Sequence, residues 1–283
     1  MTPARPNAAT RETDGLSWMQ AGPEIGSGAL TLLFVGGYGC NKEVWRHQFE
    51  RLSDRYTCIA LDMPGHGASR PQPARSSIEG YGQVVNELRA HLGLERPVLV
   101  GHSMGGRVAL EASRQAPEAW GGLLLLDVSR AVSPDHDLDE RRKLSAGESH
   151  KAFRAHMRAM FEQNFSETCD PAIREEIRAS SKALDHATAN ALTPTIGAWD
   201  HSHWEEAVRS LKCPLYIVQS TYLVYGQARH ILEEGENTPW FDMVREIHPD
   251  VEIDMIRTGH FSMLEEPVRV CEAIAKFANR LSI

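Results

Sequence analysis

The sequence predicts an α/β protein with a mostly parallel, doubly wound sheet and a helical cap inserted before the last two strands. Three observations carry this prediction. Apolar runs without period-two alternation, each closed by a turn signal, alternate with helical patterns in the first half of the chain. No strand pattern occurs between Ser129 and about residue 210, and strand character then returns twice. Such alternation is typical of open parallel sheets, whose sites lie at the carboxyl ends of the strands.

The expected elements follow from the same patterns. Apolar runs predict buried strands at 30–35, 57–62, 97–100, 122–127, 214–218 and 251–256. Helical patterns predict helices at about 42–53, 79–92, 104–116 and 267–281. We therefore expect a flexible tail at 1–14, a core formed by 15–129 and 211–283, and a helical cap at 130–210.

Composition and charge narrow the class of protein. The net charge of −8 argues against nucleic acid or an anionic membrane as the main partner. No run approaches the roughly 18 apolar residues of a membrane span, and the first residues lack the apolar stretch of a secretory signal. The five cysteines form no CxxC pair, so we expect buried, reduced thiols in a cytoplasmic protein. A small-molecule substrate, no cofactor, and a monomer or homodimer are the corresponding expectations.

One pentapeptide has the form of a nucleophile turn. Gly101-His-Ser103-Met-Gly105 fits G-x-S-x-G and lies between an apolar strand and a helical stretch. Glycines allow a sharp turn that lifts the serine above the sheet and places the Met104 N–H at a helix N-terminus. The alternative is a glycine-rich turn whose serine only caps the helix.

Together with three further motifs, this turn makes the chain resemble the α/β-hydrolase superfamily from about residue 15 onward. The motifs are Gly36-Gly37-Tyr38-Gly39, the segment Asp62–Ser69, and Gly259-His260-Phe261. The resemblance implies that Ser103 is the nucleophile, that His260 is its base, and that the Tyr38 and Met104 amides form the oxyanion hole. Many members have histidine where Gly36 stands, a departure of little consequence because the group used is a backbone amide. We interpret Asp62–Ser69 as a structural turn, and expect His102 to pack beneath the serine.

The position of the acidic residue departs from the pattern of most family members. Most members carry it after the strand that follows the cap, but here residues 219–230 contain no carboxylate. Asp127 ends the preceding strand, and a buried carboxylate there needs a partner such as the His260 imidazole. Asp127 is therefore the predicted acid. Glu233 or Glu234 is the alternative, because both lie near the family's usual spacing from His260, although their segment looks like an exposed acidic loop.

Aromatic and apolar residues predict the walls of a pocket for a small-to-medium, largely apolar substrate. The candidates are Gly37, Phe153, Met157, Phe161, Trp199, Trp204, Trp240 and Phe261. Core packing is the alternative for each of the helical candidates. His201 and His203 have no third ligand in register, so we interpret them as polar cap residues and expect no metal.

These residues predict a serine hydrolase that cleaves a carboxylic ester or lactone through an acyl-enzyme intermediate. Hydrolysis of an amide, a formamide or a carbon–carbon bond would use the same residues. A cofactor-independent dioxygenase on the same fold is a further alternative, in which the histidine deprotonates the substrate. Oxygen consumption and insensitivity to loss of the serine would distinguish it. A non-catalytic ligand sensor is disfavoured because serine, histidine and an acid are all present.

Overall fold

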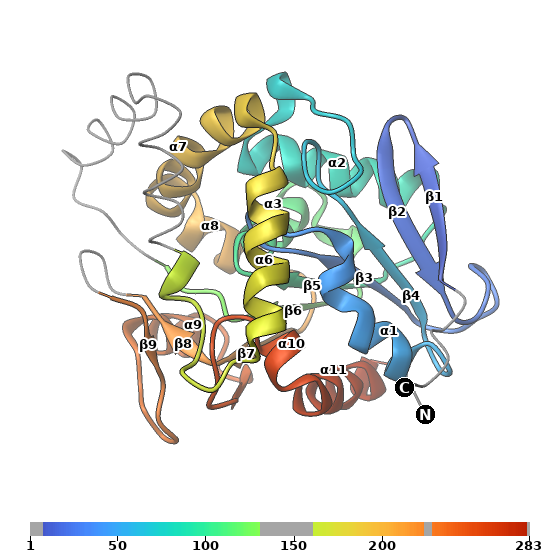
Figure 1. The fold of residues 1–283 in the computed structure, drawn as a ribbon. Coiled ribbons are helices and arrows are strands. Elements are labelled where there is room, and N and C mark those ends of the chain that lie inside the picture. Colours follow the sequence, from blue (N-terminus) through green and yellow to red (C-terminus); the bar gives the residue numbers. More distant parts are fainter. Residues whose placement is uncertain (1–7, 131–160, 224–227, 282–283) are drawn as a thin grey trace, which may run out of the picture.

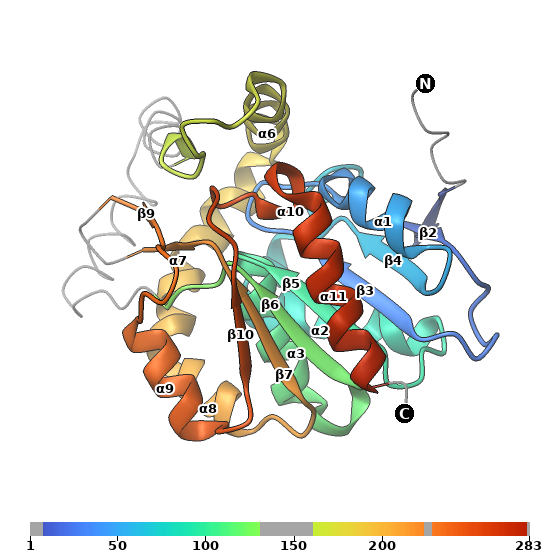
Figure 2. The same ribbon diagram turned by 90° about the horizontal axis from the view of Figure 1, so that it is seen from below.

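The computed structural model describes residues 8–130, 161–223 and 228–281. An eight-stranded sheet in the order β1-β2-β4-β3-β5-β6-β7-β10 forms its centre, with helices on both faces (Figures 1 and 2). Six of these strands run parallel, whereas β2 is antiparallel to β4 and β1 is antiparallel to β2. The predicted fold class is confirmed.

The six predicted strands all form. They are β3 (Thr31–Val35), β4 (Thr57–Leu61), β5 (Val98–His102), β6 (Gly122–Leu126), β7 (Leu215–Gln219) and β10 (Glu252–Met255). Every residue of β4, β5, β6 and β7 is buried, because helices cover both faces of the sheet. This two-sided burial explains why these strands appear in the sequence as continuous apolar runs.

The predicted tail is wrong at Ala9–Thr13, which forms strand β1. It pairs with β2 (Leu16–Ala21) as an antiparallel hairpin. Asp14 and Gly15 connect the two strands with φ of 50° and 80°, the backbone that a tight hairpin turn requires. β1 is almost entirely exposed and so lacks an apolar pattern, which leaves the Asp-Gly pair as its signal.

The helices divide between the two faces of the sheet. One face carries η1 (Lys42–Trp45), α1 (Arg46–Leu52), α10 (Ser262–Glu265) and α11 (Pro267–Leu281), and Figure 2 shows α1 beside α11. The other face carries α2 (Ile78–His91), α3 (Met104–Gln115), α8 (Trp204–Arg209) and α9 (Pro239–Ile247). The short turns η2 (Pro73–Arg75) and η3 (Pro117–Ala119) precede α2 and follow α3, respectively, and have no buried residues. The four predicted core helices are confirmed.

The segment between β6 and β7, called here the helical insertion, contains α6 (Pro171–Ala183), α7 (His186–Ser202) and α8 in its described part, residues 161–210. Asp170 and Asp185 accept hydrogen bonds from the first turns of α6 and α7, which fixes where these helices begin. After β7, a ribbon of β8 (Thr221–Tyr222) and β9 (His230–Ile231) forms, which the sequence did not predict.

Two further properties bear on the sequence-based expectations. All five cysteines are buried and unpaired, as predicted. Among the helices in the described ranges, none has the length and apolarity needed to cross a membrane.

Candidate active site

Ser103 occupies a sharp turn between β5 and α3. Its backbone has φ 54° and ψ −117°, a conformation that non-glycine residues rarely adopt. The turn needs its glycines, since a Cβ on Gly101 would lie 2.4 Å from the Gly105 carbonyl oxygen and one on Gly105 would lie 2.3 Å from that of Val35. The Ser103 side chain makes no capping hydrogen bond to α3. Its hydroxyl is therefore not used to cap the helix, contrary to the structural alternative.

Asp127 follows β6 and is completely enclosed by hydrogen-bond donors. Its Oδ1 accepts from the backbone N–H groups of Ser220 (2.8 Å) and Thr221 (2.6 Å) and from Gln219 Nε2 (3.2 Å). Its Oδ2 accepts from Thr221 Oγ1 at 2.6 Å. The end of β7, which lacks a carboxylate of its own, thus supplies the donors that hold the carboxylate of the neighbouring strand.

His260 completes this arrangement. Its Nδ1 lies 2.5 Å from Asp127 Oδ2, so the imidazole donates its Nδ1 proton to the carboxylate. The backbone N–H of His260 donates to the Asn164 carbonyl at 2.7 Å, and its carbonyl accepts from His102 Nε2 at 2.9 Å. The His102 ring lies under this site as expected, 4.6 Å from the His260 ring centroid to centroid.

The electrostatics favour a neutral imidazole beside an ionised carboxylate. Burial lowers the pKa of His260 to about 4, with the charge of Arg229 acting in the same direction and Asp127 opposing. Burial would raise the pKa of Asp127, but the His260 hydrogen bond and charge and the charge of Arg229 together hold that pKa below its ordinary value. At neutral pH the histidine is therefore free to accept a proton at Nε2.

Of the two predicted oxyanion-hole residues, Met104 directly follows Ser103, and Tyr38 follows Gly37, which lies close to Ser103. Met104 is the first residue of α3, so its N–H is among those that a helix leaves without an intrahelical partner. Gly37 approaches the serine closely, since a Cβ on Gly37 would lie 3.2 Å from Ser103 Cβ. The next residue, Tyr38, is fixed by a 3.1 Å hydrogen bond between its hydroxyl and Thr193 Oγ1 of α7.

The alternative acids lie in a different environment. Glu233 accepts two hydrogen bonds from Arg257, both 2.9 Å, and the side chains of this pair are 65% and 67% exposed. Glu234 is also exposed. Since Asp127 occupies the Nδ1 side of His260, the geometry favours Asp127 over both glutamates.

The predicted pocket residues separate into two groups. Phe261 lies 5.4 Å from the His260 ring and Phe161 lies 6.5 Å from the Tyr38 ring, between centroids, so both are near the site. Trp199, Trp204 and Trp240 belong instead to the helical layer that covers α3, where they pack edge to face with centroid separations of 5.8 and 5.0 Å. Their packing explains them as core residues. Phe153 and Met157 lie outside the described residues.

Two other sequence features have structural explanations. Asp62 accepts hydrogen bonds from Lys42 Nζ (2.7 Å) and from the Lys42 and Ala68 N–H groups (2.6 and 2.9 Å), which fits the structural turn expected at Asp62–Ser69. In the described ranges, no group of three or more histidine, cysteine, aspartate or glutamate residues is placed to hold a metal. His203 instead lies 3.8 Å from each of Glu79 and Glu206.

The sequence-based interpretation missed the residues that surround the acid. Gln219, Ser220 and Thr221 carry no recognisable catalytic pattern, and their signal was only the absence of a carboxylate after β7. Arg229 was missed as well. Its NH1 lies 3.6 Å from Asp127 Oδ2 and donates to Thr221 Oγ1 at 2.8 Å.

Curated relatives match part of the chain. Among curated relatives, a dihydrolipoyllysine-residue acetyltransferase component of an acetoin cleaving system from Cupriavidus necator is 40% identical over 93 residues, which cover 33% of this chain and 25% of the relative. The first curated relatives are matched over only 25% to 40% of their own length.

Solved structures resemble the whole chain. A thermophilic esterase from Thermogutta terrifontis has a TM-score of 0.77 at 24% identity, with 99% of this chain and 100% of the other covered. The enol-lactonase from Burkholderia xenovorans LB400 has a TM-score of 0.76 at 16% identity, with 96% and 100% covered. At these identities the likeness shows the fold. The profile of the alpha/beta hydrolase family matches residues 32–273, most of the sequence, and the chain belongs to this family.

Proposed function

We propose that this protein is a serine hydrolase that cleaves a carboxylic ester or lactone through an acyl-enzyme intermediate. The observation that carries the proposal is the hydrogen bond between His260 and the buried Asp127 at the same sheet edge as Ser103. Ser103 and Asp127 follow the adjacent parallel strands β5 and β6, and His260 follows β10, so all three lie beyond carboxyl ends of the sheet, where α/β proteins place their sites. Ser103 lies in a turn with positive φ, and its hydroxyl does not cap α3, which supports the same assignment.

The proposed roles follow from the geometry. His260 Nε2 takes the hydroxyl proton as Ser103 Oγ attacks the substrate carbonyl, and Asp127 stabilises the imidazolium through Nδ1. The Tyr38 and Met104 amides receive the negative oxygen of the tetrahedral intermediate. The bond to the leaving alkoxide then breaks, and His260 returns the proton to that oxygen. Water attacks the acyl-enzyme with His260 again as base, which releases the acid and restores Ser103.

The surroundings of the site support a largely apolar substrate. Phe261 and Phe161 are apolar side chains near His260 and Tyr38, respectively. The solved structures that resemble the chain include an esterase and an enol-lactonase, which supports an ester or lactone carbonyl as the reacting group. We therefore propose a small-to-medium apolar ester or lactone as substrate.

The test compares hydrolysis of short- and medium-chain p-nitrophenyl esters and simple lactones by the wild type and by Ser103→Ala. We expect kcat to fall by about 10⁴-fold or more, since loss of the nucleophile leaves only binding and oxyanion stabilisation. A fluorophosphonate probe should add its mass to the peptide containing Ser103. Ser113→Ala is the matched control, because Ser113 is a buried serine of α3, the helix that follows Ser103, and its hydroxyl has no partner among the described residues.

Three outcomes would redirect the proposal. Ester hydrolysis that survives in Ser103→Ala would contradict an acyl-enzyme. Serine-dependent cleavage of amides or diketones in place of esters would move the substrate class while keeping the residues. Oxygen uptake with a hydroxyquinolone-type ring, unaffected by loss of the serine, would support the dioxygenase alternative.

A further inference from the structure

We propose that Arg229 is a positioning residue for the Asp127–His260 pair: it orients Asp127 through the Thr221 hydroxyl, and its charge sets the acid limit of activity. This inference rests on the proposed function and assigns a role to a residue that lies outside the serine, histidine and acid. Three observations lead to it, and they concern hydrogen-bond direction, burial and the surrounding charges.

The hydrogen bonds run in one direction toward the carboxylate. Arg229 NH1 donates to Thr221 Oγ1 at 2.8 Å. A guanidinium has no acceptor atom, so the single hydroxyl proton of Thr221 must point elsewhere, and Asp127 Oδ2 lies 2.6 Å away to receive it. The same Oδ2 accepts from His260 Nδ1. Arg229 therefore fixes the orientation of the Thr221 hydroxyl. This hydroxyl and the His260 imidazole both donate to Asp127 Oδ2.

The charge of Arg229 acts in a buried environment. The Arg229 side chain is 12% exposed and that of Asp127 is fully buried, with NH1 3.6 Å from Oδ2. An arginine stays charged under such burial, and charges in this setting interact more strongly than in water. Within the described ranges, the polar contacts of Arg229 are with Thr221 and Asp127. The positive charge of Arg229 therefore acts mainly on Asp127 and His260.

The other charged or titratable groups near His260 include Arg107, His102 and Glu265, whose carboxylate lies against Gly259 and accepts a hydrogen bond from Ser166 Oγ at 2.5 Å. Arg107 of α3 forms a two-fold ion pair with Asp200 of α7, with both hydrogen bonds 2.7 Å long. His102 of β5 is kept neutral, because burial lowers its pKa to about 3. Burial lowers the pKa of His260 most, the charge of Arg229 and to a smaller extent that of Arg107 lower it further, and Asp127 raises it. Arg229 therefore acts together with burial to keep the base unprotonated in mildly acidic solution.

Arg229 also has a purely structural explanation that the experiment must separate. It directly precedes β9, and Thr221 begins β8, so their hydrogen bond joins the two strands of the small ribbon. A ribbon contact alone predicts a loss of stability when Arg229 is replaced. The charge predicts, in addition, a shift of the His260 titration that Arg229→Gln causes and Arg229→Lys does not, and this comparison is therefore the decisive measurement.

The experiment follows the titration of the His260 imidazole by NMR in a Ser103→Ala background, with and without Arg229→Gln. Without Arg229 we expect the midpoint to rise by about one pH unit. Arg229→Lys should retain most of the wild-type midpoint because it keeps the charge. In the enzyme that retains Ser103, the acid limb of kcat/KM should move by the same amount. Arg257→Gln, which removes an exposed arginine paired with Glu233, is the matched control and should leave both unchanged.

An unchanged midpoint in folded Arg229→Gln would overturn the proposal, whatever happens to stability. Arg229→Met keeps the apolar stem and supplies the same comparison if the glutamine variant does not fold. Because the titration is read without turnover, failure of the proposed hydrolysis would appear separately, as absent activity in a protein whose midpoint still responds to Arg229.

Discussion

The carboxylate of Asp127 is the acceptor for five hydrogen bonds, and this number makes its replacement informative. In Asp127→Asn, the amide nitrogen would replace one of the two accepting oxygens and would therefore lie against hydrogen-bond donors. If it lies next to His260, the imidazole loses the acceptor that keeps its proton on Nδ1. We expect kcat to fall by about 10⁴-fold, the loss seen in serine proteases that lose this acceptor. Steady-state ester kinetics measure it. Glu233→Gln is the control, and activity that falls with Glu233 but survives the loss of Asp127 would assign the acid to the exposed loop.

The acid limit of the wild-type enzyme can also be predicted at this scale. The base must be unprotonated, and burial lowers the pKa of His260 to about 4. Activity should therefore be nearly constant from pH 7 to about pH 5 and fall tenfold per unit once the pH drops below that pKa. The pH profile of kcat/KM with a pH-insensitive ester measures the limb. A midpoint near 6.5, the ordinary value for histidine, would contradict the burial argument.

Single residues also show what sequence reasoning could and could not reach. Ser103 and His260 belong to short motifs with a local mechanism, and Asp127 followed from a missing carboxylate further along the chain. Thr221 and Arg229 lie 94 and 102 positions beyond Asp127 and have no pattern of their own, so only the paired strand ends reveal them. Trp199 could not be separated from a pocket residue, because burial against a helix and burial against a ligand demand the same side chain.

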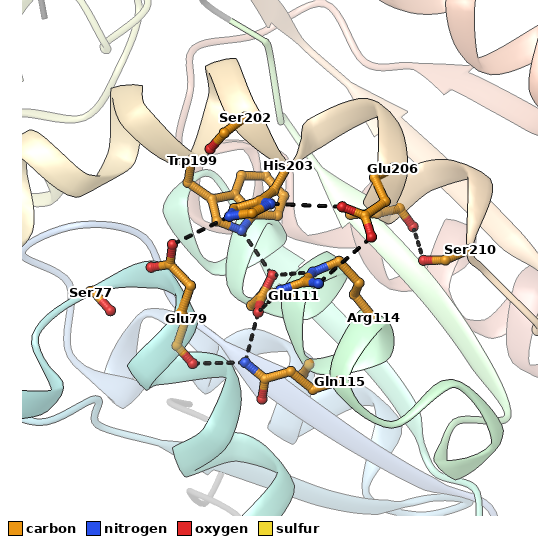
Figure 3. Close-up of polar contacts among 12 residues, drawn as sticks. Ser77, Glu79, Glu111, Arg114, Gln115, Trp199, Ser202, His203, Glu206 and Ser210 are labelled. Carbon is orange, nitrogen blue, oxygen red and sulfur yellow. Dashed lines mark hydrogen bonds and ion pairs between the residues drawn. The ribbon is translucent and has the colours of Figure 1, made fainter.

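Between elements, the principal connection runs from α3 to the helical insertion. Arg107 and Glu111 lie one turn apart on α3, and they hold the consecutive residues Asp200 and Trp199 of α7. Figure 3 shows Glu111 at the centre of the second contact, where Trp199 Nε1 donates at 2.9 Å and Arg114 and Gln115 also donate to the carboxylate. Because α3 begins directly after Ser103, the insertion is anchored to the element that carries the serine.

This anchoring predicts a cost for a small substitution. Trp199→Phe removes one donor from the buried Glu111 carboxylate, and we expect it to lower the free energy of unfolding by about 1–3 kcal/mol beyond the loss of packing. Urea denaturation measures the change. Trp240→Phe is the matched control, because Trp240 is equally buried but its Nε1 has no partner among the described residues. Equal losses for the two variants would show that the hydrogen bond contributes nothing.

At the level of elements, the sequence predicted the strands and helices that have a buried face. The six parallel strands and the core helices have apolar patterns long enough to recognise. The hairpin strand β1 is exposed and the ribbon strands β8 and β9 have two residues each, so neither produces such a pattern. These elements form because other parts of the chain pair with them.

For the whole molecule, buried histidines predict how stability depends on pH. Burial lowers the pKa of His66 and His260 to about 4 and that of His102 to about 3. Below pH 6.5 the unfolded chain protonates these side chains while the folded protein does not, so stability is full above 6.5 and is lost as the pH falls toward 4. Each histidine contributes up to about 1.4 kcal/mol per pH unit in this range. Urea midpoints at pH 7 and pH 5 should differ accordingly, and by less in His66→Gln.

The position of the insertion determines the order in which Asp127 and its partners leave the ribosome. Asp127 lies before the insertion, its donor Thr221 lies 94 residues later, and His260 lies 133 residues later. During synthesis the ribosome therefore releases the acid long before the groups that solvate it, and a carboxylate cannot be buried alone without a large desolvation cost. A growing chain that ends before β7 should keep the end of β6 open to water. Asp127 can be buried with its partners only after Thr221 and His260 have also emerged.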